Sequence, residues 1–354
     1  MLKALSSIRL ADSRVILGRL CDHMSEHGEV RREGDVGSIA LSFGTAVVEA
    51  TDHGLDVVAT ATDETGLSYV KMGVVHHVRE FAGSQAVDIR WSGDGVSGTT
   101  PAFFREMRVL RAFDVTPRMR RVVLTGENLE RFASHGLHVR LIFPPEGREP
   151  VWPHVGDDDC PVWPVGDDTL TARVYTIRHV DLAAAEIWID ILRHDGDATP
   201  GSRFAVTAKP GDRVGMTGPG GGTVPHAASL LLFGDETALP AIARILEVLP
   251  GHARVRAVIE VAGPQEEQAL TSAANLTLEW LHRDTGATKL ADVLDAIEIE
   301  SLAPDTFVWA GCEFADFRRM RRRVRSDWKL GRDRHLVVAY WRKGAAGDEA
   351  RADA

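Results

Sequence analysis

Arg173-Val-Tyr-Thr-Ile-Arg178 is the most informative segment of this chain. It mixes two β-branched apolar residues with basic and hydroxyl-bearing ones. Alternate side chains of an extended segment share one face, so we expect Arg173 and Tyr175 on one side and Val174 in a core on the other. Arginine pairs with phosphate, and a phenol ring packs on an aromatic plane. The face suits a flat, phosphorylated cofactor, although an ordinary strand edge is the better explanation of this motif taken alone.

Composition narrows the class of protein. The chain has 354 residues, enough for two or three domains, with 44% hydrophobic and 26% charged residues, as in globular proteins. We find no apolar run of membrane-spanning length and no apolar core of a signal peptide near Met1. Three widely spaced cysteines argue against a disulfide framework, so we expect a cytoplasmic protein. A net charge of −10 argues against general nucleic-acid binding.

Apolar periodicity predicts a multidomain protein whose first part is a small α+β domain. Helical spacing and strand-like alternation follow one another before a Ser/Gly/Thr-rich linker at residues 92–100. The predicted helices cover 15–24 and 64–81, and the predicted strands cover 38–43, 45–50, 55–60 and 87–91.

The rest of the chain divides into two further patterns. Short strands with Gly/Pro punctuation predict an antiparallel β-barrel, interrupted by a long loop at 144–169 that is functional or mobile. Strand–helix alternation after residue 229 predicts a doubly wound, parallel α/β sheet. The barrel strands are expected at 106–112, 120–125, 139–143, 171–177, 186–192 and 213–217. The later strands are expected at 230–233, 254–261, 276–281, 306–310 and 336–340, with helices at 239–249, 290–297 and 314–324.

Further motifs follow the first one in a recognisable order. They are Asp190-Ile-Leu-Arg-His194, Pro200-Gly-Ser-Arg-Phe-Ala205, Pro210-Gly-Asp-Arg-Val214, Gly218-Pro-Gly-Gly221, Gly234-Asp-Glu-Thr-Ala-Leu-Pro240 and Ala339-Tyr-Trp-Arg-Lys-Gly344. Together, over about 103–344, they resemble the siderophore-interacting protein family of flavin-dependent ferric-siderophore reductases, relatives of the ferredoxin reductases. Residues 1–92 are similar to a small bacterial domain of unassigned activity.

The resemblance implies three domains: 1–92, a barrel at 103–225 that binds FAD, and an α/β domain at 226–344 that binds NAD(P)H. It places Arg173 on phosphate, Tyr175 against the isoalloxazine, and Arg178 near the cofactor or the substrate. Hydrogen bonds to the flavin ring are implied for Thr176, often through its backbone, and Ile177 is placed among the cofactor-binding residues. The pyrophosphate would meet His194, Gly201 and Ser202. This chain reads His194-Asp195 where the family has His-Gly, and the turn that follows is one residue longer.

The segment 234–240 lies at a predicted strand-to-helix junction, where a nicotinamide nucleotide docks in doubly wound sheets. The usual Gly-x-Gly-x-x-Gly is absent, and a well-capped structural helix explains the residues equally well without the resemblance. The resemblance implies that Asp235, Thr237 and Ala238 lie at the nucleotide. Glu260 would favour NADH if it reached the ribose.

The resemblance implies electron transfer from NAD(P)H through FAD to a ferric siderophore, a small-molecule partner, with release of iron(II) and with no catalytic acid or base. Arg342 and Lys343 are candidate contacts to an anionic chelate. Two alternatives remain: a general flavin or ferredoxin-type reductase with another acceptor, and a non-catalytic siderophore-binding protein. The sequence does not predict the siderophore, the choice of NADH or NADPH, or the oligomeric state.

Three charged motifs have simpler explanations. His23-Met-Ser-Glu-His27 matches a zinc-peptidase pattern, but Gly28 ends the helix at once, and we predict no metal site. The acidic run 157–159 is expected to be a solvated loop, and the arginine-rich run 318–325 a solvated helix face.

Overall fold

The computed structural model describes residues 1–95, 100–134, 136–193, 199–286 and 288–345. The chain forms two compact units. The first contains Met1–Phe104 and Pro144–Leu170, and the second contains Arg105–Phe143 and the residues from Thr171 onward. None of the helices in the described ranges combines the length and the apolar character needed to cross a bilayer.

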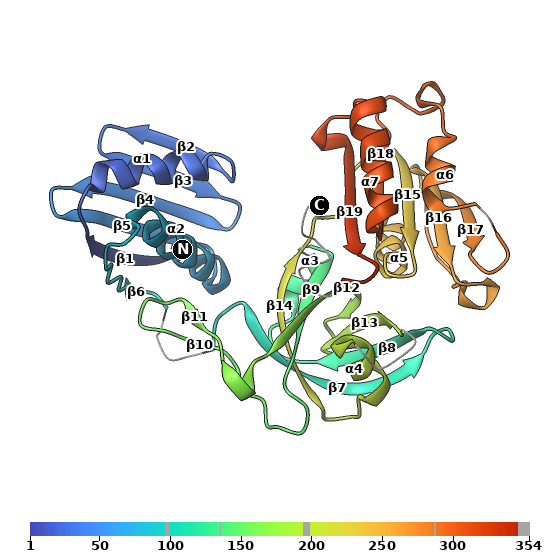
Figure 1. Cartoon of the computed structure of the whole chain (residues 1–354), viewed down its shortest axis with the longest axis horizontal. Helices are drawn as coiled ribbons and strands as arrows, with labels where there is room; N and C mark the ends of the chain where they lie inside the picture. The colour runs from blue at the N-terminus through green and yellow to red at the C-terminus, as the bar shows by residue number, and fades with distance from the viewer. Residues whose placement is uncertain (96–99, 135, 194–198, 287, 346–354) are drawn as a thin grey trace. The chain divides into compact units, whose positions relative to one another are not determined.

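The N-terminal part of the first unit is an antiparallel sheet of order β2-β3-β4-β5-β1-β6, and both helices pack on it and on each other (Figure 1). Its core joins the inward residues of the strands to the apolar stripes of the two helices. The elements are β1 (Leu2–Arg9), α1 (Ser13–Met24), β2 (Glu29–Glu33), β3 (Val36–Leu41), β4 (Gly44–Thr51), β5 (Gly54–Ala61), α2 (Glu64–Ala82) and β6 (Ser92–Gly93).

The predicted strand at 87–91 is wrong. Ile89 is buried because it covers the core, but the segment pairs with no strand in the described ranges. The last strand is instead Ser92–Gly93, which pairs with Leu5 and Ala4 of β1 and lies in the predicted linker. An apolar residue that covers a core and one that alternates along a strand have the same composition, so the pattern could not distinguish them.

The second unit begins with a closed barrel of order β12-β13-β8-β7-β14-β9, which confirms the predicted antiparallel barrel. A closed barrel has no exposed edge, and its interior is filled by one side chain of every two. Its elements are β7 (Phe104–Asp114), β8 (Met119–Thr125), α3 (Glu130–Ser134), β9 (His138–Phe143), β12 (Thr171–Asp181), β13 (Glu186–Leu192), α4 (Pro200–Thr207) and β14 (Arg213–Gly220).

A parallel sheet of order β17-β16-β15-β18-β19 follows, as predicted. Helix α5 packs on one face, and α6 and α7 pack on the other, so the central strands are apolar on both sides. The elements are β15 (Ser229–Asp235), α5 (Leu239–Val248), β16 (Arg254–Val261), β17 (Asn275–His282), α6 (Leu290–Asp295), β18 (Phe307–Glu313), α7 (Phe314–Arg322), a π-helical turn at Arg323–Asp327, and β19 (His335–Trp341). The strand order reverses direction between β15 and β18, which places a ligand crevice at their carboxyl ends.

The long segment between β9 and β12 belongs to the first unit, although its two ends lie in the barrel. It forms a small hairpin, β10 (His154–Val155) with β11 (Pro161–Val162). Lys71 of α2, only 2% exposed, donates to Asp159 and to the carbonyl of Asp94, each at 2.6 Å. Arg79 pairs with Asp158, also at 2.6 Å. The expectation of a solvated acidic loop is therefore wrong, because two of its three aspartates are neutralised by α2.

Substituting Lys71 tests how firmly this segment is held. Lys71→Met leaves the Asp159 carboxylate buried without its cation, a change that costs about 3–5 kcal/mol. The first unit should therefore unfold at lower urea concentration. Asp159 has a φ of 60°, which asparagine tolerates, so Lys71→Met combined with Asp159→Asn should recover much of the loss. A single variant as stable as the wild type would contradict this account of the ion pair.

Candidate functional site

Strand β12 carries the Arg-x-Tyr-Thr segment and pairs with β9 and β13 inside the barrel. Tyr175 packs against the barrel core beside fully buried Ile177. Val174 is only half-buried and lies outside that core, so its expected direction is wrong. Side chains alternate along β12 as predicted, but the face that points into the barrel core is the one with Ile177 and Tyr175.

The structure brings Tyr175 and the Pro-Gly-Ser turn together. A Cβ at Gly201 would overlap the Tyr175 hydroxyl oxygen, so any larger residue there would require the phenol to move. Gly201 and Ser202 are buried in the first turn of α4, and the side chain of the N-cap residue, Thr199, makes no capping hydrogen bond in the described part of the chain. Uncapped N–H groups at a helix start attract anions. Burial raises the pKa of Tyr175 to about 12, so its phenol stays protonated and can donate a hydrogen bond.

The other predicted flavin residues differ in their surroundings. Arg173 is half-buried and donates to the carbonyl of Ala172 at 2.8 Å. Thr176 is 4% exposed and pairs in register with His138 of β9. Arg178 forms an ion pair at 2.6 Å with Glu247 of α5, so it joins the barrel to the α/β sheet. His194 lies outside the described residues.

Asp235 ends β15 at the point where the strand order reverses. Its carboxylate accepts from the backbone N–H and the hydroxyl of Thr237, at 2.9 and 2.5 Å, and from the indole N–H of Trp341 at 2.8 Å. These bonds link the start of α5 to the last strand. Ala238 is fully buried and packs close to Gly234. Despite its bonds, burial raises the pKa of Asp235 to about 6.

Glu260, at the end of the neighbouring strand β16, is 8% exposed and already bonded. It accepts from Arg283 at 3.1 Å and from the backbone N–H of Leu290, at the start of α6, at 3.2 Å. Arg283 also pairs with Glu236. The carboxylate therefore supports α6 and Arg283, and the structure does not favour its role as a ribose ligand.

Two residues that sequence reasoning missed fasten the barrel to the sheet. Arg244 of α5 donates to the barrel carbonyls of Phe132, Gly136 and Ile177 at 3.1–3.3 Å. His138 contacts the Tyr340 hydroxyl with Nε2 at 2.7 Å. Neither residue belongs to a motif. The only available signal for Arg244 was a cation on a helix with an otherwise apolar stripe.

The candidate chelate contacts lie just after β19. The Arg342 guanidinium lies 4.6 Å from the centre of the Phe314 ring. The backbone N–H of Lys343 donates to Glu313 at 3.1 Å, and its side chain is exposed. Both cations follow directly after Trp341, the indole that contacts Asp235, so they lie at the same end of the sheet as the crevice.

The chain joins an antiparallel barrel to a doubly wound sheet, and the barrel matches a family model for FAD binding, so it is a two-domain flavoprotein oxidoreductase that uses FAD and NAD(P)H. Family models agree. Residues 108–223 match "Siderophore-interacting FAD-binding domain", 227–344 match "Siderophore-interacting protein", and 6–92 match "Uncharacterized protein conserved in bacteria". The chain belongs to the siderophore-interacting protein family.

Individual relatives agree with this membership. The ferric vibriobactin reductase of Vibrio cholerae is 28% identical over 65% of this chain and 86% of its own length. The NADPH-dependent ferric-chelate reductase of Escherichia coli is 32% identical over 67% of this chain and 92% of its own. The crystal structure of a siderophore utilization protein from T. fusca is 38% identical and covers 71% of this chain and 97% of its own, with a TM-score of 0.61.

The raised pKa of Asp235 predicts a measurable dependence of stability on pH. The folded protein holds this proton up to about pH 6, whereas an unfolded aspartate loses it near 3.8. Between these values the unfolded chain binds fewer protons, so the contribution of Asp235 to stability falls as pH rises, by about 3 kcal/mol in total.

Urea unfolding of the wild type and of Asp235→Asn from pH 4 to pH 7 measures this difference. The variant keeps an amide oxygen for Thr237 but cannot titrate. We expect the wild type to lose stability relative to the variant as pH rises to 6, and to change little above that. A stability difference that does not change with pH would contradict the raised pKa.

Proposed function

We propose that this protein is a ferric-siderophore reductase, which passes electrons from NAD(P)H through FAD to iron(III) and releases iron(II). The observation that carries the proposal is the convergence of Tyr175, Gly201 and the start of α4 at one place in the barrel. The reductases named above act on ferric vibriobactin and on ferric chelates, and they match 65% and 67% of the chain.

The residues present suit FAD. Gly201 lets the Tyr175 phenol lie against the start of α4, and a helix N-terminus favours an anion such as the pyrophosphate. Arg173 lies on the same strand face as Tyr175 and is the candidate phosphate partner. Thr176, Ile177 and Ser202 complete the proposed set, and Arg178 would have to exchange Glu247 for any cofactor contact.

FAD, when bound, accepts two electrons as hydride and gives them up singly, which a one-electron acceptor such as iron(III) requires. The chain's own residues orient the partners. Arg244 and Arg178 hold β12 against α5. The His138–Tyr340 contact joins the barrel to the sheet near the carboxyl end of β19, on the side of the crevice. Asp235 and Thr237 shape that crevice for the nicotinamide nucleotide, and Ala238 packs beneath them.

We also propose the domain limits 1–92, 103–225 and 226–344, with the siderophore as the small-molecule partner. Arg342 and Lys343 would attract an anionic chelate to a chain that carries a net charge of −10. The coenzyme preference is tested first with NADPH, because the E. coli relative depends on it.

The test uses the full chain loaded with FAD under anaerobic conditions. Flavin absorbance is followed on addition of NADPH or NADH, and then of a ferric siderophore together with a ferrous-iron trap. We expect bleaching by the nucleotide, recovery with the ferric chelate, and trapped iron(II). Bleaching without recovery would support a general flavin reductase instead, and failure to bind FAD would leave a non-catalytic siderophore-binding protein.

Charge substitutions after β19 give a sharper prediction. Arg342→Gln and Lys343→Gln should each lower kcat/KM for an anionic ferric chelate about three- to tenfold, and the loss should shrink at high ionic strength. Flavin reduction by the nucleotide should stay unchanged. The matched control is Arg254→Gln, an exposed arginine at the start of β16 and so at the opposite end of the sheet. Equal effects of all three substitutions would contradict a local docking site.

A further inference from the structure

The N-terminal domain contains a group of imidazoles for which the reductase chemistry has no use. The rings of His23 on α1 and His77 on α2 have centroids 4.5 Å apart, and His77 lies 4.9 Å from His76. His27, just after α1, continues the row at 5.1 Å from His23. The two helices pack together, so residues about fifty positions apart in sequence form one cluster.

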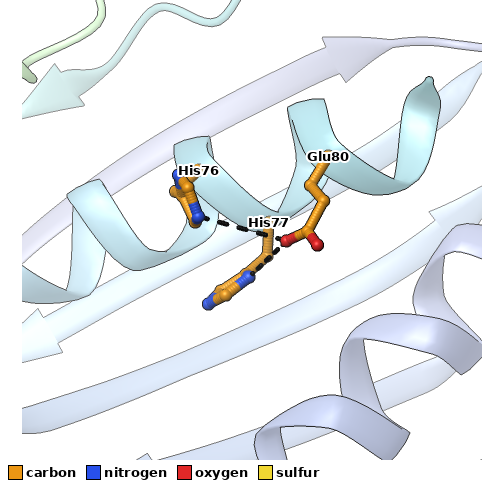
Figure 2. Close-up of side chains that lie close together, drawn as sticks. All are labelled: His76, His77 and Glu80. Atoms are coloured by element: carbon orange, nitrogen blue, oxygen red, sulfur yellow. Dashed lines mark hydrogen bonds and ion pairs between the residues drawn. The ribbon is translucent and has the colours of Figure 1, made fainter. Parts of the chain in front are cut away.

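A carboxylate completes this cluster. Glu80 lies one turn after both histidines of α2, and its Oε2 is 3.2 Å from Nδ1 of His77 and 4.0 Å from Nε2 of His76. Figure 2 shows the Glu80 carboxylate in contact with both imidazoles. One potential ligand atom from each of these three residues lies within 4.8 Å of the other two.

Ordinary helix pairing explains only part of this arrangement. A glutamate commonly bonds a histidine three or four residues away on the same helix. The contact between His23 on α1 and His77 lies outside that pattern, because it joins two packed helices. Two imidazoles that bind one metal at about 2.0–2.1 Å have ring centroids about 5 Å apart, close to the spacings seen here.

We propose that His76, His77 and Glu80 bind a divalent first-row transition-metal ion, with His23 packed against His77 beside the site. Imidazole nitrogens with one carboxylate suit zinc, iron(II), cobalt and nickel, whereas magnesium and calcium prefer oxygen ligands. His76 and Glu80 are exposed, and His77 is mostly buried, so the site opens to solvent on one side and is fixed on the other. The prediction of no metal site rested on the lack of a clear third ligand for His23 and His27, although His53, His76 and His77 lie nearby in the sequence.

The test is equilibrium dialysis of the full chain, followed by metal analysis, with zinc, with iron(II) under argon, and with magnesium as separate probes. We expect about one zinc or iron(II) per chain and no magnesium. Zinc should bind more tightly, following the usual order of affinities. The iron(II) arm asks whether the site accepts the ion that the proposed reaction would release. Metal content needs neither NAD(P)H nor flavin, so this result is independent of the proposed function.

Substitutions locate the bound ion. Glu80→Gln keeps the shape of the side chain, and His76→Gln changes an exposed residue, so neither threatens the fold. Each should weaken zinc binding at least about tenfold. The control His53→Gln alters an exposed histidine of the same domain that belongs to no cluster in the described residues. The proposal is overturned if no stoichiometric zinc or iron(II) binds, if magnesium binds equally well, or if His53→Gln weakens binding as much as Glu80→Gln.

Discussion

Arg244 holds the barrel and the parallel sheet together through several backbone carbonyls of the barrel. Its guanidinium donates to the carbonyls of Phe132 and Gly136, which precede β9 in the sequence, and to that of Ile177 in β12. Backbone carbonyls cannot move independently of their strands, so this contact fixes position more firmly than a pair of flexible side chains would. The Arg178–Glu247 pair and the His138–Tyr340 contact add to it from the barrel side and from the last strand. Electron transfer between two cofactors depends steeply on their placement, and this joint sets that placement before any ligand arrives.

The contacts between α5 and the barrel also bear on the arrangement of the crevice. Asp235 at the end of β15 bonds Thr237 at the start of α5 and Trp341 at the end of β19. Helix α5 therefore connects the flavin strand, through Arg244, to the nucleotide crevice, through Thr237. The N-terminal domain has no assigned part in this chemistry. It holds the segment between β9 and β12 through the buried Lys71–Asp159 pair, and it contains the cluster of histidines.

Most of the fold could be predicted from the sequence, because the strands after residue 229 are short apolar runs and the helices carry regular apolar stripes. The order of motifs also predicted the family and its cofactors. The predictions were wrong where contacts between residues distant in the sequence, and not the local sequence pattern, determined the structure. Ile89 is apolar and buried but does not lie in a strand. In β12, Ile177 belongs to the barrel core and Val174 does not. Asp159 looked like a solvated residue until Lys71 lay beside it, and no spacing rule links residues 71 and 159. The cofactor residues themselves stay predictions, and His194 lies outside the described residues.

The most direct test of the joint is the rate of flavin reduction by NADPH in Arg244→Met, measured by anaerobic stopped flow on the FAD-loaded chain. Methionine keeps the apolar part of the side chain but cannot donate to the three carbonyls. The account predicts that FAD affinity changes little, because Tyr175, Gly201 and the start of α4 are untouched, while the reduction rate at saturating NADPH falls about tenfold or more. An unchanged rate, with FAD fully bound, would contradict the claim that Arg244 sets the placement of the two domains.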